Sequence, residues 1–285
     1  MELTLEGIAG EETPPDLVCW GETMFPFSLV SDEVLEAAGS GLTRLSHVRQ
    51  LEQGELEQSR VLVDGLVEGM LFGRSERLGE SIVRLLLLRL DGAWVRRGVE
   101  EGRLLPEGTS FLTGIREWTV HAGAIRSRNS VALWSSDGQL SATAAKTRLV
   151  PVAEDSDLYS GFPWVVDLVS RSGGFVPDFV PGEEVGVLEL TTREGRRYSF
   201  GATVCYDNVY DDPFAVPASD PDLDFHLVAS NEGWYGTSVE MDHMVAFSRL
   251  AAIATGRSVV RATNSGVSLV LDPSGAAVGL SLIHI

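Results

Sequence analysis

Seven apolar runs, most of them continuous rather than alternating with polar residues, restrict the possible folds of this chain more than any other feature. They span residues 17–20, 131–134, 185–190, 198–206, 225–229, 258–262 and 267–271. Continuous apolar runs of this length are typical of strands that are covered on both faces. Apolar residues recur at helical spacing over 239–255, and also between 55 and 90, where we expect two helices. Strands mixed with helices along the whole chain predict an α/β protein.

Composition narrows the classes of function. The 285 residues are 44% hydrophobic, which is enough for one large domain or two small ones. The formal net charge of -19 repels nucleic acid and anionic lipid headgroups, so no nucleic-acid partner is expected. No signal peptide opens the sequence, and no stretch reaches the ~18 apolar residues of a membrane-spanning helix. The chain as written is therefore expected to be soluble.

The position of one cysteine suits a catalytic nucleophile. Cys205 ends one predicted strand, at the edge of the polar stretch 208–212, and such a thiol attacks carbon if a neighbour removes its proton. The second cysteine, Cys19, lies inside an apolar run and is predicted to pack as a small hydrophobic residue. A disulfide between the two is permitted by the count but is not required by it.

Two further residues supply the chemistry that such a thiol needs. Glu22 follows the first apolar run and can act as the base, whereas Lys146 can stabilise a thiolate and later a tetrahedral oxyanion. The backbone N–H of Tyr206 is a natural second donor to the oxyanion. Taken singly, each of these side chains is more often a solvated strand end, a surface cation or core filler, so the hypothesis depends on the sequence around each one.

The sequence around each residue resembles the nitrilase superfamily, whose members use a Glu–Lys–Cys triad in an α-β-β-α sandwich. Residues 16–26 are similar to the first motif, with Gly21 in place of the usual proline. Residues 146–154 are similar to the second motif, and 204–207 to the third, with Asp207 in place of the usual glutamate. The resemblance implies that Glu22, Lys146 and Cys205 are catalytic and that Glu154 orients Lys146. It also implies a single domain over 1–285.

Within the superfamily, the apolipoprotein N-acyltransferases are most similar, on the segments 231–236, 248–266 and 272–275. This resemblance implies transfer of a fatty acyl group from a phospholipid, through a thioester on Cys205, to the N-terminal amine of a diacylglyceryl-cysteine lipoprotein. It places Trp234 and Tyr235 beside the substrate. It implies no cofactor, and the five histidines lack the spacing of metal ligands. It also implies an enzyme of the cell inner membrane with its catalytic domain on the extracytoplasmic face.

Departures from the family pattern leave alternatives open. The family carries transmembrane helices that this sequence lacks, so we expect a catalytic-domain fragment, also truncated near residue 285. The alternative is a soluble carbon–nitrogen hydrolase, an amidase that uses the same triad, and a non-catalytic member is disfavoured by the intact triad. The loop 173–184 is a candidate lid, and His243 is expected to be structural. The segment 29–106 is longer than the usual spacer after the first motif.

Overall fold

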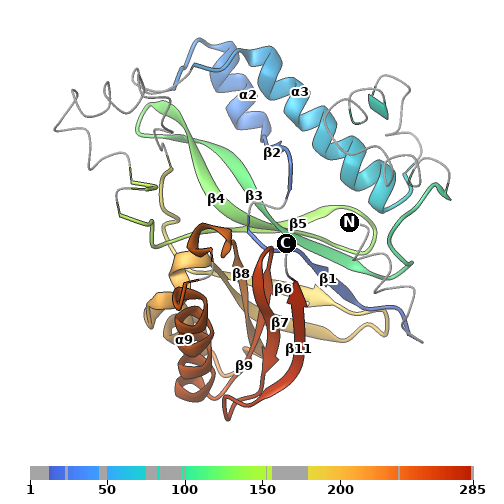
Figure 1. Ribbon diagram of the computed structural model, residues 1–285. Coiled ribbons are helices and arrows are strands. Elements are labelled where there is room, and N and C mark those ends of the chain that lie inside the picture. The colour runs from blue at the N-terminus through green and yellow to red at the C-terminus, as the bar shows by residue number, and fades with distance from the viewer. Residues whose placement is uncertain are drawn as a thin grey trace.

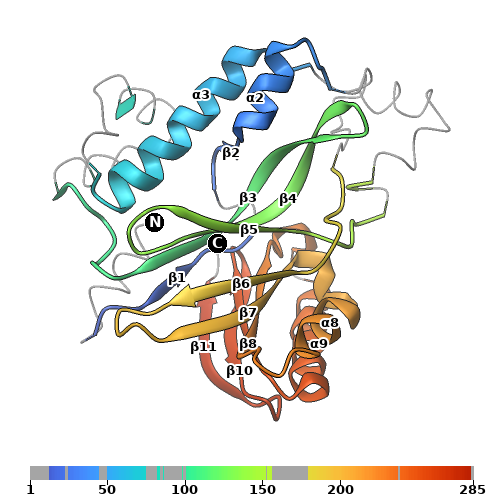
Figure 2. The ribbon, with the colours of Figure 1, turned by 180° about the vertical axis from the view of Figure 1, so that it is seen from behind.

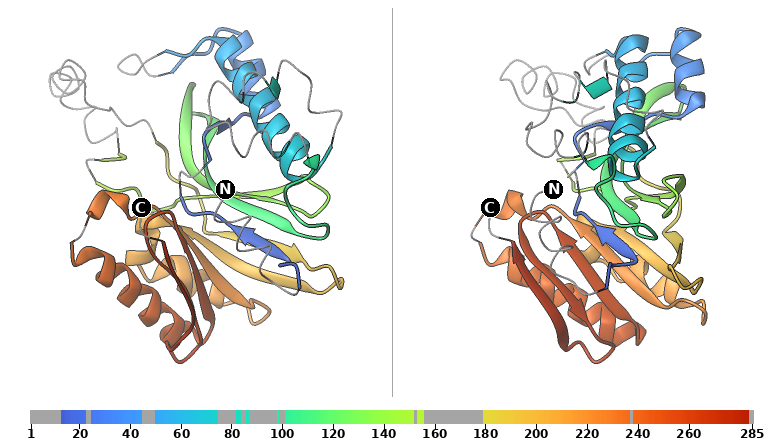
Figure 3. Two further views of the ribbon diagram at one scale, coloured as in Figure 1. Left: turned by 45° about the vertical axis from the view of Figure 1, so that its right-hand side comes forward. Right: turned by 90° about the vertical axis from the view of Figure 1, so that its right-hand side faces the viewer.

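Two β-sheets packed face to face, with helices on their outer faces, form the molecule. The computed structural model describes residues 13–22, 25–44, 50–74, 82–83, 86, 98, 101–151, 153–155, 179–236 and 238–283. Figure 1 shows α2 and α3 covering one sheet, while α9 lies against the outer face of the other. The layers are visible from two further sides in Figure 3. The α-β-β-α sandwich expected from the sequence is confirmed.

The first sheet has the strand order β1-β3-β4-β5, and β2 also pairs with β3. Its strands are β1 (Leu17–Cys19), β2 (Ser28–Leu29), β3 (Ser110–His121), β4 (Ala124–Trp134) and β5 (Leu140–Ala145). On its outer face lie α2 (Asp32–Gly39), α3 (Gln53–Asp64) and the π-helical turn η1 (Gly65–Leu71). Their apolar side chains, Leu62, Leu66 and Met70 among them, pack on Phe111 and Ile115 of β3.

The second sheet has the order β11-β10-β9-β8-β7-β6. Its strands are β6 (Gly186–Thr191), β7 (Arg197–Val204), β8 (Phe225–Ser230), β9 (Ser258–Thr263), β10 (Gly266–Leu271) and β11 (Ala277–Ile283). Its helices are α8 (Asp212–Ala218) and α9 (Glu240–Thr255), with the 3₁₀ turns η3 (Cys205–Val209) and η4 (Gly233–Tyr235). Figure 2 shows α8 and α9 beside each other on the outside of this sheet.

The core between the sheets draws on both of them. Leu112 and Val131 of the first sheet pack with Phe200, Val204 and Leu227 of the second. All five side chains are fully buried. Because strands in this layer are covered on both faces, their sequences are nearly continuous in apolar residues, as in β7 and β8.

Three neighbouring strands of the second sheet run parallel, and this direction positions the site. β7 pairs parallel with β8, and β8 pairs parallel with β9. Their carboxyl ends therefore lie at one edge of the sheet, where loops gather polar side chains. Cys205, Asn231 and Asn264 follow these three strands directly.

The expected helices were partly found. The helix predicted over 239–255 is α9, and it ends at Gly256 with a left-handed φ of 63°, which suits glycine at that position. Of the two helices expected between 55 and 90, the first corresponds to α3 continued by η1. The second lies mostly outside the described residues, as do residues 173–178 of the candidate lid. None of the described helices is long and apolar enough to cross a bilayer.

Candidate active site

Glu22, Lys146 and Cys205 all follow strand ends at the edge where the two sheets meet. Glu22 comes three residues after β1, Lys146 directly follows β5, and Cys205 directly follows β7. All three side chains are buried, Lys146 completely. The structure thus brings together three residues that are separated by 124 and 59 positions in the chain (146 − 22 and 205 − 146).

Gly21 allows the first sheet to approach the second closely. A Cβ at this position would lie 2.7 Å from the Asn264 nitrogen and 2.7 Å from the Ser230 oxygen, and both of these are backbone atoms. Backbone atoms cannot move aside as a flexible side chain can, so a larger residue would push Glu22 away from the second sheet. Close approach of the two sheets therefore explains why glycine occupies this position of the first motif.

Two donors hold the carboxylate of Glu22. The side-chain amide of Asn129, on β4, donates to Oε1, and the backbone N–H of Asn231, after β8, donates to Oε2 at 3.0 Å. The carboxylate is thus fixed by one group from each sheet. Two hydrogen bonds define its orientation as well as its position.

Lys146 forms an ion pair with Glu154. Its Nζ lies 2.8 Å from Oε2 and 2.9 Å from Oε1 of that carboxylate. The backbone N–H of Val150 donates to the same carboxylate at 2.7 Å, which fixes Glu154 in turn. Lys146 is also held by its main chain, which bonds Asn129 and Gly182 at 2.8 Å each.

Cys205 has a left-handed backbone, with a φ of 50°. A non-glycine residue in this region costs about 1–3 kcal/mol, and such conformations persist only where the surroundings enforce them. Here the carboxylate of Asp207 enforces the turn by accepting a hydrogen bond from the Val204 N–H at 3.1 Å. The turn projects the thiol from the end of β7 instead of continuing the strand.

Asp207 also joins the cysteine turn to the segment after the lysine. Its Oδ1 accepts hydrogen bonds from the Thr147 N–H at 3.1 Å, the Thr147 hydroxyl at 3.1 Å and the Arg148 N–H at 2.7 Å. The shorter aspartate therefore makes a full set of contacts in place of the glutamate that is usual in the family. Burial raises the pKa of Asp207, and these hydrogen bonds oppose that rise.

The local charges keep the resting thiol protonated and the amine charged. Burial raises the pKa of Cys205, Glu22 adds to the rise through its charge and a hydrogen bond, and Lys146 opposes it. Burial acts to lower the pKa of Lys146, but the charges of Cys205, Glu22 and Glu154 outweigh it and raise the pKa. A proton can therefore pass from sulfur to Glu22 when sulfur attacks, while the ammonium remains available to a developing oxyanion.

Asn129 was not identified from the sequence. It is buried on β4, and its Nδ2 bonds both Glu22 and, at 3.3 Å, Glu154. Its Oδ1 is buried without a hydrogen-bond partner. The available signal was an amide side chain two residues before the apolar run 131–134. This amide connects the carboxylate beside the thiol with the carboxylate beside the ammonium.

The three aromatic residues predicted to serve the site lie in different surroundings. Tyr206 lies in η3, where its ring meets that of Tyr210 edge-on at 5.5 Å between centroids. Tyr235 is half-buried, and its pKa is raised to about 12 by burial and by the charges of Cys205 and Glu240. Trp234, by contrast, is 84% exposed. Tyr235 thus lies within electrostatic reach of the Cys205 thiol, while Trp234 is largely exposed to solvent.

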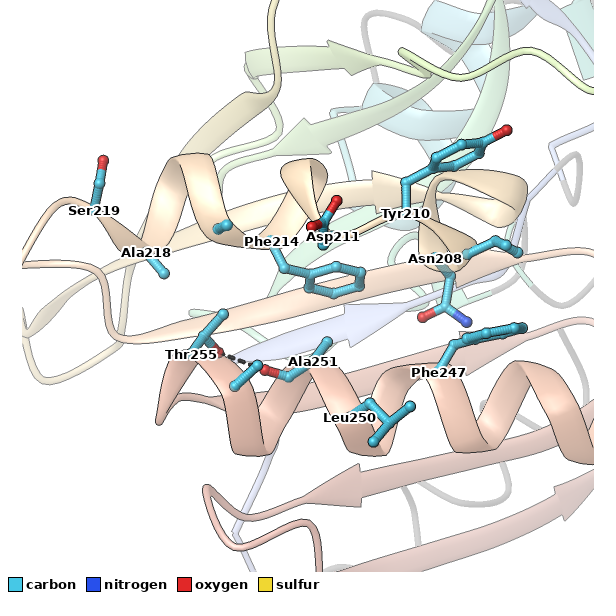
Figure 4. A pocket seen from close by; sticks show the side chains of 13 residues that line it. Asn208, Tyr210, Asp211, Phe214, Ala218, Ser219, Phe247, Leu250, Ala251 and Thr255 are labelled. Atoms are coloured by element: carbon cyan, nitrogen blue, oxygen red, sulfur yellow. Dashed lines mark hydrogen bonds between the residues drawn. The ribbon is translucent and has the colours of Figure 1, made fainter.

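A cavity of about 440 Å³ lies beside the cysteine turn but not over the thiol. Figure 4 shows it between α8 and α9, with Phe214, Phe247 and Leu250 on its walls and Asn208 at one end. Glu22, Lys146 and Cys205 are not among its lining residues. Within the described part of the chain, no group of three or more His, Cys, Asp or Glu is placed to hold a metal ion.

Cys19 is expected to affect stability rather than chemistry. Both cysteines are free thiols, and burial raises the pKa of Cys19 from 9.0 to about 12. The folded protein therefore keeps this proton at pH values where the unfolded chain loses it. The resulting stabilisation is complete below the unfolded pKa and is lost as the pH rises toward the folded pKa.

Replacing Cys19 with alanine should therefore flatten the alkaline loss of stability, by up to about 1.4 kcal/mol per pH unit. Urea unfolding of both proteins at about pH 8 and about pH 10.5 measures this difference. Acylation of the protein should be unchanged in Cys19→Ala. An equal alkaline loss in the two proteins would contradict the prediction.

Comparison with known proteins agrees with this geometry. The family model for carbon-nitrogen hydrolases matches residues 107–281. An apolipoprotein N-acyltransferase of Rhodopseudomonas palustris is 31% identical over 183 residues, which cover 61% of this chain and 32% of that protein. Another from Chlorobaculum tepidum is 30% identical over 130 residues, 46% of this chain and 24% of that protein. The chain thus spans about a quarter to a third of the length of these relatives.

Solved structures are more distantly similar. XC1258 from Xanthomonas campestris, described as a CN-hydrolase superfamily protein with an arsenic adduct in the active site, is 17% identical. The match covers 98% of this chain and 77% of that chain, with a TM-score of 0.48.

The fold and the site define an α/β sandwich with a buried carboxylate, ammonium and thiol at the common edge of its sheets. The family model covers more than half of the chain, including Lys146 and Cys205. The chain belongs to the carbon–nitrogen hydrolase family.

Proposed function

We propose that this domain is an acyltransferase that carries a fatty acyl group as a thioester on Cys205. The acyl donor is a phospholipid, and the acceptor is the N-terminal amine of a diacylglyceryl-cysteine lipoprotein. The observation that carries the proposal is the convergence of Glu22, Lys146 and Cys205 in a chain whose curated relatives are named apolipoprotein N-acyltransferases. In the cell, the domain would act at the extracytoplasmic face of the inner membrane.

In the first step, Glu22 takes the thiol proton as the sulfur of Cys205 attacks the ester carbonyl carbon of the phospholipid. A carbon–sulfur bond forms, and the carbonyl oxygen becomes an oxyanion that Lys146 and the backbone N–H of Tyr206 stabilise. When the oxyanion collapses, the carbon–oxygen bond breaks. Glu22 returns its proton to the departing alcohol, which leaves as a lysophospholipid.

In the second step, the free amine of the lipoprotein attacks the thioester. A carbon–nitrogen bond forms, Glu22 takes a proton from the nitrogen, and the same two groups stabilise the second oxyanion. The carbon–sulfur bond then breaks, and the thiol is restored by the proton on Glu22. Glu154 supports both steps because it holds the ammonium of Lys146 in place.

The surface beside the site supports a lipid donor. Trp234 is 84% exposed and Val239 is 67% exposed, and both lie on the segment that follows Asn231. Because the Asn231 N–H at the start of this segment bonds Glu22, exposed apolar side chains on it suit a substrate with long acyl chains better than a small polar amide. In this proposal Tyr235 lies along the path to the thiol, and Trp234 contacts the acyl chain outside it.

The alternative is an amidase, in which water rather than an amine attacks the thioester. The family model that matches this chain is named for the hydrolysis of carbon–nitrogen bonds, and this favours the alternative. The same three residues would serve both reactions. The two hypotheses therefore differ in the acyl donor and in the acceptor, not in the nucleophile.

Intact-protein mass spectrometry separates these hypotheses. The protein is incubated with phospholipid vesicles and, separately, with a simple aliphatic amide, without any acceptor amine. We expect an added fatty acyl mass from the phospholipid, removable by hydroxylamine and located on the Cys205 peptide. Turnover of the amide without a lipid adduct would refute the acyltransferase hypothesis and support the amidase hypothesis.

Two variants serve as matched controls for this experiment. Cys19→Ala keeps the candidate nucleophile and should acquire the adduct, whereas Cys205→Ser keeps the other thiol and should acquire none that hydroxylamine removes. An adduct that disappears in Cys19→Ala and persists in Cys205→Ser would contradict the assignment of the nucleophile.

A further inference from the structure

A series of buried polar side chains lies behind the site, with Arg261 of β9 at its centre. Arg261 donates through Nη2 to the carboxylate of Glu232, and both side chains are completely buried. Its Nη1 donates to the hydroxyl of Ser248 on α9 at 2.6 Å. That hydroxyl donates to Oδ1 of Asn208 at 2.6 Å. The guanidinium thus joins Glu232 to Asn208 through one serine.

A backbone carbonyl of α9 closes this arrangement. Met244 O accepts from Arg261 Nη1 at 3.1 Å and from Asn208 Nδ2 at 2.7 Å. Arg261 and Asn208 are therefore attached to the same turn of α9 as well as to Ser248. Since Met244 and Ser248 belong to the buried stripe of the helix, α9 serves as a fixed support for both.

The two ends of the series lie next to the two reacting groups of the proposed mechanism. Glu232 is the neighbour of Asn231, whose backbone N–H bonds the carboxylate of Glu22 at 3.0 Å. Asn208 lies three residues after Cys205 in the same 3₁₀ turn. The series therefore connects the loop that holds the base with the turn that presents the thiol.

Stability alone is a weak reason for such an ion pair. Removing two charges from water costs more than their attraction commonly returns, whereas a buried pair can specify one geometry. The planar guanidinium donates in fixed directions, so it sets angles between its partners as well as distances. The chain is also shaped around the carboxylate, because a Cβ at Gly266 would lie 2.2 Å from Glu232 Oε2.

We propose that Arg261 is a positioning residue that sets the separation of Glu22 and the Cys205 thiol by tying the Asn231 loop to the cysteine turn. Arg261 acts through Glu232 on one side and through Ser248 and Asn208 on the other. The inference depends on the proposed function, since it gives Arg261 a role in forming the thioester.

The test uses two variants. Arg261→Lys keeps the positive charge but lacks the planar guanidinium that donates to several partners in fixed directions. Ser248→Ala leaves Arg261 paired with Glu232. For each variant, kcat and KM of acylation by phospholipid vesicles, the rate of iodoacetamide alkylation of the Cys205 peptide, and the melting temperature are measured. We expect kcat and the alkylation rate at neutral pH to fall about 10- to 100-fold. KM should be unchanged, and both variants should remain folded at the assay temperature.

Thr255→Val is the matched control, because it removes a hydroxyl that donates at 2.8 Å to the Ala251 carbonyl of the same helix, away from the network. It should alkylate and acylate as the original protein does. If Arg261→Lys does not fold, the result for Ser248→Ala alone tests whether the network positions the thiol.

Three outcomes separate the possibilities. Normal rates in a folded Ser248→Ala variant would overturn the positioning role, as would an equal loss in Thr255→Val. A protein that acquires no acyl group from lipid, while alkylation still slows in Ser248→Ala, would refute the proposed function. That last result would support the positioning of the thiol by this network.

Discussion

Replacing Cys205 with serine is expected to reduce acyl transfer by at least about three orders of magnitude, since removing a catalytic nucleophile can cost as much as ~10⁶ in kcat. The hydroxyl is similar in size to the thiol, so the turn enforced by Asp207 should persist. A serine hydroxyl loses its proton far less readily than a thiol, so transfer of that proton to Glu22 is far less favourable. Single-turnover acylation by phospholipid, followed by mass spectrometry, measures the loss.

The comparison protein for this experiment is Cys19→Ala. It changes the other thiol, which packs against the same apolar layer between the sheets but whose pKa is shifted by burial alone, without a charged neighbour such as Glu22 or Lys146. Its acylation rate should equal that of the unchanged protein. Near-normal turnover in Cys205→Ser, with a melting temperature showing that it is folded, would refute the thioester mechanism.

Replacing Lys146 with alanine is expected to slow acylation by ~10²–10³, the usual cost of one donor to the oxyanion. Lys146 is completely buried beside Glu154, and the charges of Cys205, Glu22 and Glu154 raise its pKa, which favours the ammonium form. The variant loses the cation that opposes the rise in the pKa of Cys205. Alkylation of that thiol by iodoacetamide should therefore also slow, and pre-steady-state acylation gives the size of the main effect.

Lys146→Arg tests whether charge alone is sufficient. A guanidinium is larger than an ammonium and planar, so at this completely buried position it would displace Glu154 or other neighbours. We expect this variant also to lose acylation, although it keeps the charge. Unchanged single-turnover rates in Lys146→Ala would show that Lys146 does not stabilise the oxyanion.

The sequence is informative about Lys146 in a further way. It is the only lysine among the 285 residues, while the other 21 of the 22 basic residues are arginines. A chain that uses arginine elsewhere and keeps one lysine at a fully buried position indicates a requirement for a compact cation. This signal is independent of the three motifs.

Much of the fold could be predicted because its inner strands are continuous apolar runs. β3 and β5 were missed for a physical reason. β3 contains Arg116 and Glu117 within its span, and the Glu117 carboxylate is satisfied by hydroxyls of Ser130 and Thr143 on the neighbouring strands. β5 consists mainly of alanine, serine and threonine, whose small side chains give little periodic signal.

The site could be predicted only as far as each residue had a recognisable local sequence. Glu22, Lys146 and Cys205 each lie in a motif, and Glu154 lies eight residues after the lysine. The Asn231 N–H that bonds Glu22 is a backbone group, so the identity of the residue does not indicate this hydrogen bond. Long-range partners of this kind, Asn129 among them, depend on how the two sheets are placed against each other.

That placement has a consequence for folding. Glu22 and Lys146 follow strands of the first sheet, whereas Cys205 and Asn231 follow strands of the second. Neither sheet contains a working set of groups by itself. During refolding, the shielded, Glu22-bonded state of the Cys205 thiol can therefore form only after the two sheets have docked. The rate at which a thiol reagent modifies Cys205 would therefore report when the two sheets dock. Circular dichroism would report the formation of secondary structure separately.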